Sequence, residues 1–403
     1  MTILFATRQL ANVRPSASAA ISQKAKMMHA AGEDVIDLGI GEPDFDTPSH
    51  IVEAAFEAVK RGETRYPPTG GTAMLKAAIA RKFARDHGLN IKANEIIVSN
   101  GAKQVIFDAL MATLEPGDEV ILCAPYFDSY RNIIALLGGE RRVVTCRRED
   151  GYRLLPDALA SAITNKTRWL ILNAPSNPAG TIYDATELRA LGDVLAQHPQ
   201  VAILSDEIYE HIHFGAAGHI SFAAACPDLV DRILTVNGVS KAYAMTGWRI
   251  GYGAGPAALI DAMVTVQSQI SSGACSVAQA AGAAALDGPQ DSVAQFRAAY
   301  LARRDLVVDA VARIPGLTLA QPGGAFYAFI DCSALLSVAT LDGKPLQDDT
   351  AVCSYLLEAA KVAAVPGSVY DMPGHFRIST ACAEDALAEA MTRIARACAA
   401  LVM

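Results

Sequence analysis

The sequence of 403 residues has no uninterrupted apolar run long enough to span a bilayer, although 52% of its residues are hydrophobic. A membrane helix needs about 20 consecutive apolar residues. The N-terminal segment also lacks the charged head, apolar core and small-residue cleavage site of a secretory signal. We therefore expect neither membrane anchoring nor export, and we expect a cytoplasmic protein.

The chain has no surplus of positive charge. It carries 34 Lys and Arg against 42 Asp and Glu, which gives a net charge of -8. Proteins that bind nucleic acids usually carry clustered basic residues that pair with phosphates. Nucleic acid is therefore not an expected partner.

The cysteines lack paired spacing. All eight are scattered between Cys123 and Cys398, and none forms a Cys-x-x-Cys pair. Such pairs are typical of zinc sites, and disulfide frameworks are typical of small secreted domains. The pattern favours reduced thiols and predicts no metal centre.

What the sequence does contain is an alternation of short apolar, β-rich segments with helical patterns. This alternation predicts an α/β fold of three layers, in which helices cover both faces of a mostly parallel sheet. The expected strands are Glu95–Val98, Glu119–Cys123, Arg142–Thr145, Arg168–Leu172, Val201–Leu204 and Arg232–Val236.

The length of the chain exceeds that of a single typical core, so two domains are expected. From about Arg297 the pattern changes to a long helix followed by short strands that look antiparallel. We expect residues 46–295 to form the large domain. Residues 296–403 are expected to form a small α+β domain, which residues 1–45 complete.

One lysine comes shortly after the last of these strands. Lys241 follows Arg232–Val236, and Arg249 stands eight residues later among glycines. Burial lowers the pKa of a lysine amine, and a neutral amine can form a Schiff base with an aldehyde such as pyridoxal phosphate. From this stretch alone, a surface loop with a solvated lysine and arginine remains the alternative.

Other turns follow expected strands at the same edge of the sheet, where ligands bind in such folds. Gly101 opens a turn whose free N–H groups can bind a phosphate. Asn177 precedes a proline that holds it extended, and Asp206 ends a strand where it can pair with a pyridine nitrogen. Each has an ordinary alternative: a tight βα turn, an Asn-Pro turn or a helix cap.

Together these motifs resemble a known family. Asn-Pro-x-Gly at 177–180, Asp-x-x-Tyr at 206–209, and Ser-Lys followed by Arg-x-Gly at 240–251 occur in this order. The combination resembles the fold-type-I pyridoxal-phosphate-dependent aminotransferases of class I/II, and it is most similar to the bacterial branch of the aspartate aminotransferase family. The resemblance extends over nearly the whole chain, from 13–16 to 376–379.

The resemblance implies transfer of an amino group between an L-amino acid and a 2-oxo acid, with pyridoxal 5'-phosphate as cofactor. Lys241, Asp206 and Tyr209 would be the catalytic residues, and Arg377 would bind the substrate α-carboxylate in a bidentate manner. The residues implied to contact the cofactor are Tyr66, Gly101, Ala102, Lys103, Phe127, Asn177, Asp206, Tyr209, Ser240, Lys241 and Arg249. Those implied to contact the substrate are Gly41, Phe127, Asn177 and Arg377.

The rigid Pro- and Gly-rich loop from Tyr66 to Gly71 has a form that often reaches another surface. By the resemblance, Tyr66 would complete the phosphate site of the other subunit. We therefore expect a homodimer with shared active sites.

Two positions depart from the aspartate-specific pattern. Phe127-Asp128 stands where that branch commonly has a tryptophan and its neighbour, and Ser271–Ser276 lacks the arginine of animal-type enzymes. Phe127 can stack on a ring but has no indole N–H for a side-chain carboxylate. We expect aspartate or glutamate turnover with a broadened range of neutral and aromatic donors.

Other functions are compatible with the same fold. The alternatives within it are a kynurenine- or glutamine-type aminotransferase and a pyridoxal-phosphate-dependent β-lyase, decarboxylase or cyclopropane-forming synthase. A ligand-sensing module of a transcriptional regulator is the alternative from another class. We do not expect that module, because it carries an additional DNA-binding segment and the fold pattern here begins almost at Met1.

Overall fold

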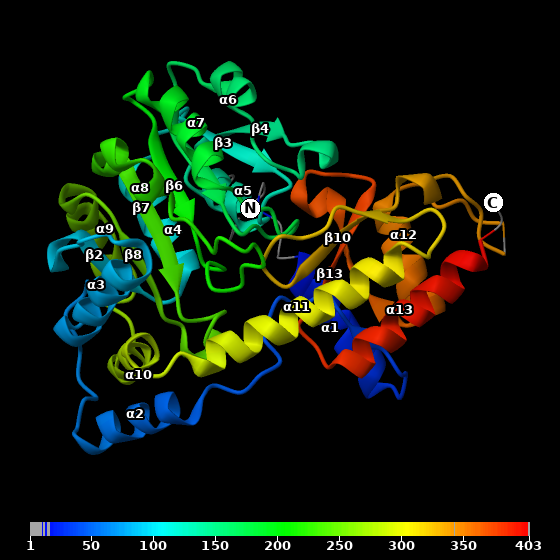
Figure 1. Ribbon diagram of the computed structural model, residues 1–403, viewed down its shortest axis with the longest axis horizontal. Coiled ribbons are helices and arrows are strands. Elements are labelled where there is room, and N and C mark those ends of the chain that lie inside the picture. Colours follow the sequence, from blue (N-terminus) through cyan, green and yellow to red (C-terminus); the bar gives the residue numbers. More distant parts are fainter. Residues whose placement is uncertain (1–9, 11–12, 14–16, 342, 402–403) are drawn as a thin grey trace, which may run out of the picture.

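The computed structural model describes residues 10, 13, 17–341 and 343–401, and its centre is a seven-stranded sheet (Figure 1). The strand order is β2-β8-β7-β6-β5-β3-β4. All pairs from β7 to β4 are parallel, which confirms the predicted mostly parallel sheet. The strands are β2 (Ile96–Ser99), β3 (Glu119–Ala124), β4 (Glu140–Thr145), β5 (Thr167–Asn173), β6 (Ala202–Asp206), β7 (Ile233–Gly238) and β8 (Gly251–Ala254).

The sequence pattern does not predict β8, which runs antiparallel between β2 and β7. Gly251 and Gly253 lower the β propensity of this segment. A Cβ on Gly253 would lie 2.8 Å from Val105 Cγ1, so the glycine lets a helix pack directly on the strand. The strand is therefore stabilised by close packing that the local pattern does not reveal.

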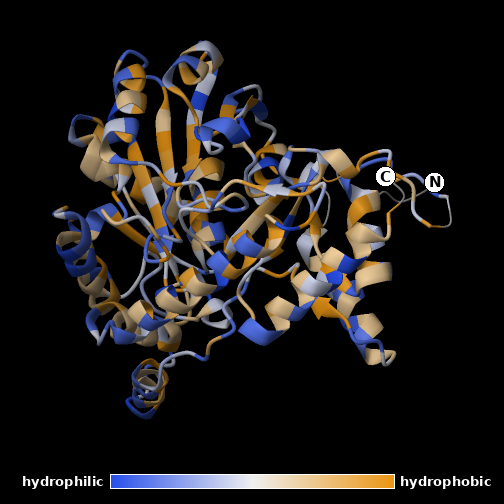
Figure 2. Ribbon diagram, turned by 45° about the vertical axis from the view of Figure 1, so that its right-hand side comes forward, coloured by the Kyte–Doolittle hydropathy of each residue, from blue (hydrophilic) through white to orange (hydrophobic). Residues whose placement is uncertain are grey.

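Helical layers cover both faces of the sheet, because successive strand residues point to opposite sides. Val120 and Leu122 pack on one layer, and Ile121 packs on the other. The strands are accordingly hydrophobic in Figure 2. The first layer consists of α4 (Ala102–Thr113), α5 (Ser129–Leu136) and α9 (Ala257–Ile270). The second contains α6 (Pro156–Ala162), α7 (Ala185–Ala196) and α8 (Phe222–Ala225).

Helices α3 (Ala73–His87) and α10 (Ser276–Asp287) pack together beside β2, and α2 (Ser49–Lys60) packs on α10 (Figure 1). The apolar residues Phe56 and Val59 of α2 are 63% and 49% exposed. Helix α2 is therefore an outlying element with an uncovered apolar surface.

A second sheet of four strands, in the order β12-β13-β10-β9, is antiparallel. It packs with α11, α12 and α13 around a separate core. The strands are β9 (Thr318–Leu319), β10 (Tyr327–Asp331), β12 (Val365–Pro366) and β13 (His375–Ser379). The helices are α11 (Asp291–Val311), α12 (Asp349–Tyr355) and α13 (Glu384–Ala399).

The N-terminal part of the chain lies against this second region. Strand β1 (Ile36–Asp37) pairs in parallel with β11 (Val362–Ala363), and α1 (Ala17–Ala30) contacts β11 and β12. Residues 14–16, part of the family resemblance, lie outside the described residues. The expected domain limits at 45/46 and 295/296 stay a prediction, and α11 crosses the second of them.

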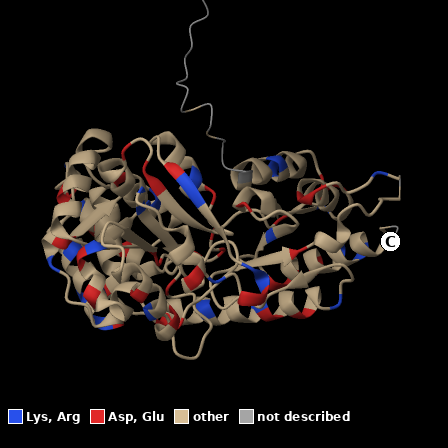
Figure 3. Ribbon diagram, turned by 90° about the horizontal axis from the view of Figure 1, so that it is seen from above, with Lys and Arg blue, Asp and Glu red and all other residues tan. Residues whose placement is uncertain are grey.

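In the described part of the chain, no helix is both long enough and apolar enough to cross a membrane. Acidic and basic residues are interspersed along the helices in the view of Figure 3.

Candidate active site

A cavity of about 360 Å³ lies at the carboxyl ends of β5, β6 and β7, where residues of β10 and β13 also reach it. Parallel strands bring the residues that follow them to one edge of the sheet. The cavity brings together most of the predicted site residues: Gly41, Ala102, Lys103, Phe127, Asn177, Asp206, Tyr209, Ser240, Lys241, Arg249 and Arg377.

Lys241 faces this cavity rather than bulk solvent. Its Nζ donates a hydrogen bond of 2.5 Å to the carbonyl oxygen of Gly41. Burial lowers the pKa of Lys241 to about 8, although the Glu42 carboxylate opposes this shift. A substantial fraction of the amine is therefore neutral near physiological pH, as a nucleophilic lysine requires. The alternative of a solvated surface lysine does not hold.

Asp206 is the last residue of β6 and is 4% exposed. Its Oδ2 accepts a hydrogen bond of 2.6 Å from the Tyr130 hydroxyl, and its Oδ1 accepts one of 3.2 Å from the Ile208 N–H. Burial raises the pKa of Asp206 to about 6, and the hydrogen bonds act in the opposite direction. Turns follow Asp206, so it does not cap a helix. A positively charged partner in the cavity would stabilise its ionised form.

Tyr209 and Tyr327 are both buried, and their hydroxyl oxygens lie 2.8 Å apart. Burial raises the pKa of Tyr209 well above its usual range, and the neighbouring Tyr327 adds to this effect. Both side chains are therefore neutral phenols that can donate hydrogen bonds.

Arg377 projects from β13 into the same cavity and is 2% exposed. Its guanidinium lies 4.5 Å above the ring of Tyr327, donates a hydrogen bond of 3.1 Å to Asn177 Oδ1, and also donates to the Gly39 carbonyl. The Arg377 Nε atom is buried and has no hydrogen-bond partner among the described residues. The guanidinium is thus fixed in place and can still bind an anion.

Arg249 stands at the exposed rim of the cavity with φ of 58°, in the left-handed region. Its guanidinium donates hydrogen bonds of 2.8 Å to the Thr246 carbonyl and 3.3 Å to the Asn100 carbonyl. A Cβ on Gly101 would collide with this guanidinium. Gly101 therefore does not line the cavity itself but lets Arg249 approach the N-terminus of α4, where anions bind favourably.

The side-chain pocket differs in part from the expectation. Phe127 lines the cavity, and Lys103 Nζ lies 5.2 Å above its ring. Asp128 is buried at the start of α5 and does not line the cavity, nor does any residue of Ser271–Ser276. Of the two unusual neighbours, Phe127 can thus contact a ligand directly and Asp128 cannot.

Two tyrosines of the site are absent from the sequence prediction. Tyr130 is the second residue of α5, three positions after Phe127, and Tyr327 lies on β10. The nearness of Tyr130 to Phe127 in the sequence is a signal that could have identified it, because their rings are in edge contact, with centroids 5.6 Å apart, and both line the cavity. No local signal identifies Tyr327.

Besides Gly101, Tyr66 is a predicted site residue that does not line this cavity. Its side chain is 93% exposed. The structure therefore does not bring Tyr66 together with the other predicted site residues.

The chain matches the family model described as aminotransferase class I and II over residues 33–394. It is 49% identical to the aspartate aminotransferase of Rhizobium meliloti over 378 residues, which cover 94% of this chain and 92% of the relative. It is 48% identical to a probable aspartate/prephenate aminotransferase of Rhizobium leguminosarum bv. phaseoli, with 98% and 99% of the two chains covered.

Solved structures give the same result. The aspartate aminotransferase from Rhizobium meliloti superposes with a TM-score of 0.96 at 47% identity and covers 99% of this chain and 100% of its own. The aspartate aminotransferase from Thermus thermophilus with maleate superposes with a TM-score of 0.91 at 39% identity, covering 98% and 100%.

Proposed function

The chain belongs to the aminotransferase class I and II family, and we propose that it transfers the amino group of L-aspartate or L-glutamate to a 2-oxo acid, with pyridoxal 5'-phosphate as cofactor. The observation that carries this proposal is a lysine with a lowered pKa that shares one cavity with Asp206, Arg249 and Arg377. These groups match the aldehyde, ring nitrogen and phosphate of the cofactor and the carboxylate of an amino acid.

The residues around the cavity fit a phosphate-bearing aldehyde. Gly101 and Gly251 leave room for Arg249 and for the N–H of Ala102, since a Cβ on either glycine would collide with them. Arg249, Ser240 and the N-terminus of α4 would bind the phosphate. When bound, the cofactor supplies an aldehyde that condenses with amines and a ring that withdraws electrons from the neighbouring carbon.

Four residues would act on that group. Lys241 would hold the aldehyde and, when its amine is free, would remove the proton from the substrate Cα. Asp206 would accept a hydrogen bond from the protonated ring nitrogen and keep it charged. Tyr209 and Asn177, which are buried, would bind the ring hydroxyl away from water.

Arg377 binds the substrate α-carboxylate. Its position above Tyr327 and beside Asn177 fixes the guanidinium plane before the substrate arrives. Two parallel N–H donors then match the two carboxylate oxygens, which a lysine cannot do. The Gly41 carbonyl, which accepts a hydrogen bond from Lys241, lies on the same side of the cavity as Arg377.

Lys103 supports the choice of an amino donor that has a carboxylate in its side chain. The Lys103 ammonium lines the cavity beside Phe127. It can donate to a side-chain carboxylate in place of the indole N–H that Phe127 lacks. The names of the relatives, aspartate and aspartate/prephenate aminotransferase, support a dicarboxylic donor and a prephenate acceptor. The apolar ring of Phe127 also favours neutral and aromatic donors.

A homodimer with shared active sites belongs to the same proposal. It is supported by the exposure of Tyr66 (93%) together with Phe56 (63%) and Val59 (49%) on α2. A second copy that covered these residues would remove apolar surface from water and bring Tyr66 to the partner's phosphate site. A cytoplasmic location is supported by the eight free cysteines, which suit a reducing compartment.

A panel of amino donors, assayed against 2-oxoglutarate, oxaloacetate, pyruvate and prephenate, tests the function. We expect turnover of aspartate and glutamate with at least one of these acceptors, and loss of turnover in Lys241→Ala. Elimination products without amino transfer would instead support the β-lyase type of reaction, and loss of CO2 would support a decarboxylase. Sedimentation of the active enzyme as a monomer would refute the shared site.

A further inference from the structure

Five charged or titratable side chains form a cluster behind the turn that carries Asp206 and Tyr209. None of them lines the cofactor cavity. Three belong to α3 and two to the turn, and we refer to them as the Lys82 cluster: Lys82, Asp86, His87, Glu210 and His211.

The centre of the cluster is a fully buried ion pair. The side chains of Lys82 and Glu210 are 0% and 3% exposed, and Lys82 Nζ contacts Glu210 Oε1 directly. His87 Nε2 lies 2.7 Å from Glu210 Oε2 and 2.9 Å from Lys82 Nζ. Burial alone would raise the pKa of Glu210, but Lys82 and the two histidines hold it well below its usual range.

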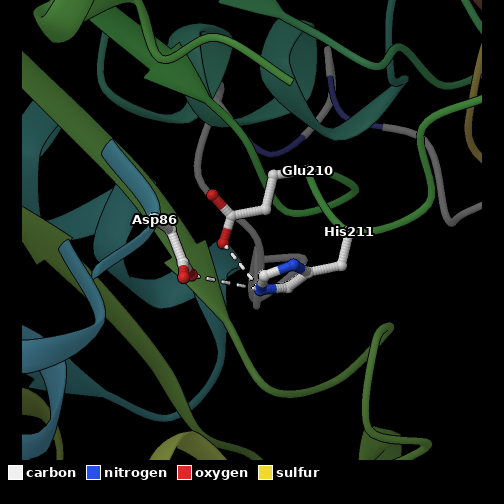
Figure 4. Close-up of side chains that lie close together, drawn as sticks. All are labelled: Asp86, Glu210 and His211. Carbon is white, nitrogen blue, oxygen red and sulfur yellow. Dashed lines mark ion pairs between the residues drawn. The ribbon is translucent and has the colours of Figure 1, made fainter. Parts of the chain in front are cut away.

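His211 closes the cluster on its outer side. Its Nε2 lies 3.3 Å from Glu210 Oε1 and 3.7 Å from Asp86 Oδ2, so one ring nitrogen faces both carboxylates (Figure 4). Lys82 Nζ also lies 3.7 Å from Asp86 Oδ2. The ammonium of Lys82 is thus shared by both carboxylates.

A buried ion pair of this kind is not explained by stability. Desolvation of the two charges costs about as much as their attraction returns, and apolar replacements are often equally stable. Buried ionic groups can instead fix one particular arrangement of the chain. The arrangement fixed here is the approach of α3 to the turn after β6.

That turn is held in place by contacts on the side that faces away from the cavity. Asp206, Ile208 and Tyr209 line the cavity, and Glu207 and Glu210 contact residues outside it. The Glu207 carboxylate accepts hydrogen bonds from the side chains of Ser205 and Ser221 and from the N–H of Phe222.

The side of the turn that lines the cavity and the side that faces away from it are linked by hydrogen bonds, so neither can move alone. The Ile208 N–H donates to Asp206 Oδ1, and the Glu207 N–H donates a hydrogen bond of 2.9 Å to the Val236 carbonyl on the strand that leads to Lys241. A displacement of Glu210 would therefore be transmitted to Asp206 and Tyr209.

We propose that Lys82 and Glu210 are positioning residues for the reaction: their ion pair sets the place of Asp206 and Tyr209 against the cofactor ring. This inference rests on the proposed function. Misplacement of a catalytic group by about 1 Å can cost about 100-fold in rate. We therefore expect loss of the ion pair to change the cofactor environment even where the protein stays folded.

The test compares Lys82→Met, Glu210→Gln and the double variant Lys82→Met/Glu210→Met with the wild-type holoenzyme. Arg81→Met is the matched control. Arg81 lies on the same helix as Lys82, but it pairs with Asp287 of α10 and not with the turn. Melting temperature, the dissociation constant for pyridoxal phosphate, the pH midpoint of the visible absorbance of the bound cofactor and kcat are measured. The absorbance needs no substrate, so it separates this inference from a failure of the proposed transamination.

We expect both single variants to melt at lower temperature, because each leaves a charge buried without its partner. The double variant should regain most of the melting temperature and still show a shifted absorbance midpoint and a kcat about 10- to 100-fold below wild type. Arg81→Met should keep the wild-type midpoint and kcat. A wild-type absorbance midpoint and a wild-type kcat in the double variant would overturn the inference and make the ion pair a purely structural feature.

A conservative variant decides the matter if the double variant does not fold. Glu210→Asp keeps the charge and withdraws the carboxylate by one carbon, so it should remain folded with an intermediate shift of the midpoint. Wild-type midpoint and kcat in Glu210→Asp would contradict a positioning role.

Discussion

The hydroxyl groups of Tyr209 and Tyr327 lie 2.8 Å apart, and the ring of Tyr327 lies 4.5 Å below the guanidinium of Arg377. Tyr327 therefore connects a residue proposed to bind the cofactor ring with the residue proposed to bind the substrate carboxylate. Gly41 permits this arrangement, because a Cβ at that position would collide with the Tyr327 hydroxyl. One side chain, Tyr327, thus contacts both Tyr209 and Arg377 and links their positions.

Replacement of Tyr327 by Phe should lower kcat/KM for every donor. The variant keeps the ring below Arg377 and removes the hydroxyl that bonds Tyr209. Loss of one buried hydrogen bond is worth about 0.5–1.5 kcal/mol, or about a 2- to 13-fold change. Steady-state kinetics measure the effect.

The control for this variant is Tyr355→Phe, which removes a hydroxyl that donates a hydrogen bond of 2.8 Å to the Ala397 carbonyl, far from the cavity. Its kinetics should match those of the wild type. An unchanged kcat/KM in Tyr327→Phe would mean that the hydroxyl pair does not help to hold Tyr209.

The amine of Lys241 should react with an aldehyde most rapidly in alkaline solution. Burial lowers its pKa to about 8, so the neutral amine predominates above that pH and the ammonium below it. An ordinary lysine has a pKa of about 10.4. In cofactor-free protein, the rate of pyridoxal phosphate capture should rise with pH through a midpoint near 8, as followed by stopped-flow absorbance.

Lys241→Ala is the control for that experiment and should abolish the fast absorbance change. A midpoint above about 10 would show that the amine behaves as an ordinary exposed lysine. Such a result would contradict the lowered pKa on which the proposed chemistry depends.

Arg377→Lys should raise KM for all donors and leave cofactor binding unchanged. The lysine keeps a positive charge but cannot form two parallel hydrogen bonds with a carboxylate. Loss of one charge-assisted hydrogen bond of about 1.5–3 kcal/mol corresponds to a loss of about 10- to 160-fold in kcat/KM. Kinetics with aspartate and alanine, together with cofactor titration, measure these values; a wild-type KM would remove Arg377 from the carboxylate site.

The sequence predicted those parts of the site that follow directly from a strand end. Asp206 and Lys241 each come soon after a buried apolar strand, so local patterning and the topology of parallel sheets were enough to bring them together. The seven-stranded sheet itself is predicted for the same reason, apart from β8, where Gly251 and Gly253 weaken the pattern.

The remaining features depend on contacts between distant segments. Tyr327 and Tyr209 are far apart in the sequence, and their hydroxyls meet only because β10 of the second sheet brings Tyr327 to the cavity. Asp128 follows Phe127 in the chain, yet it is buried at the start of α5 and does not reach the cavity. Sequence neighbours need not share an environment, and the sequence does not specify where a loop turns.

The choice of donor should depend on Lys103. Its ammonium lies 5.2 Å above the ring of Phe127 on the cavity wall, where it can pair with a side-chain carboxylate. Lys103→Met should lower kcat/KM for aspartate by about tenfold, equivalent to about 1.4 kcal/mol, with little change for alanine or phenylalanine. If Lys103 instead binds the cofactor phosphate, affinity for pyridoxal phosphate should fall and all donors should lose activity together. Arg249→Met provides the reference for that second outcome, and Phe127→Trp should raise the preference for aspartate if an indole donor can replace part of the lysine's contribution.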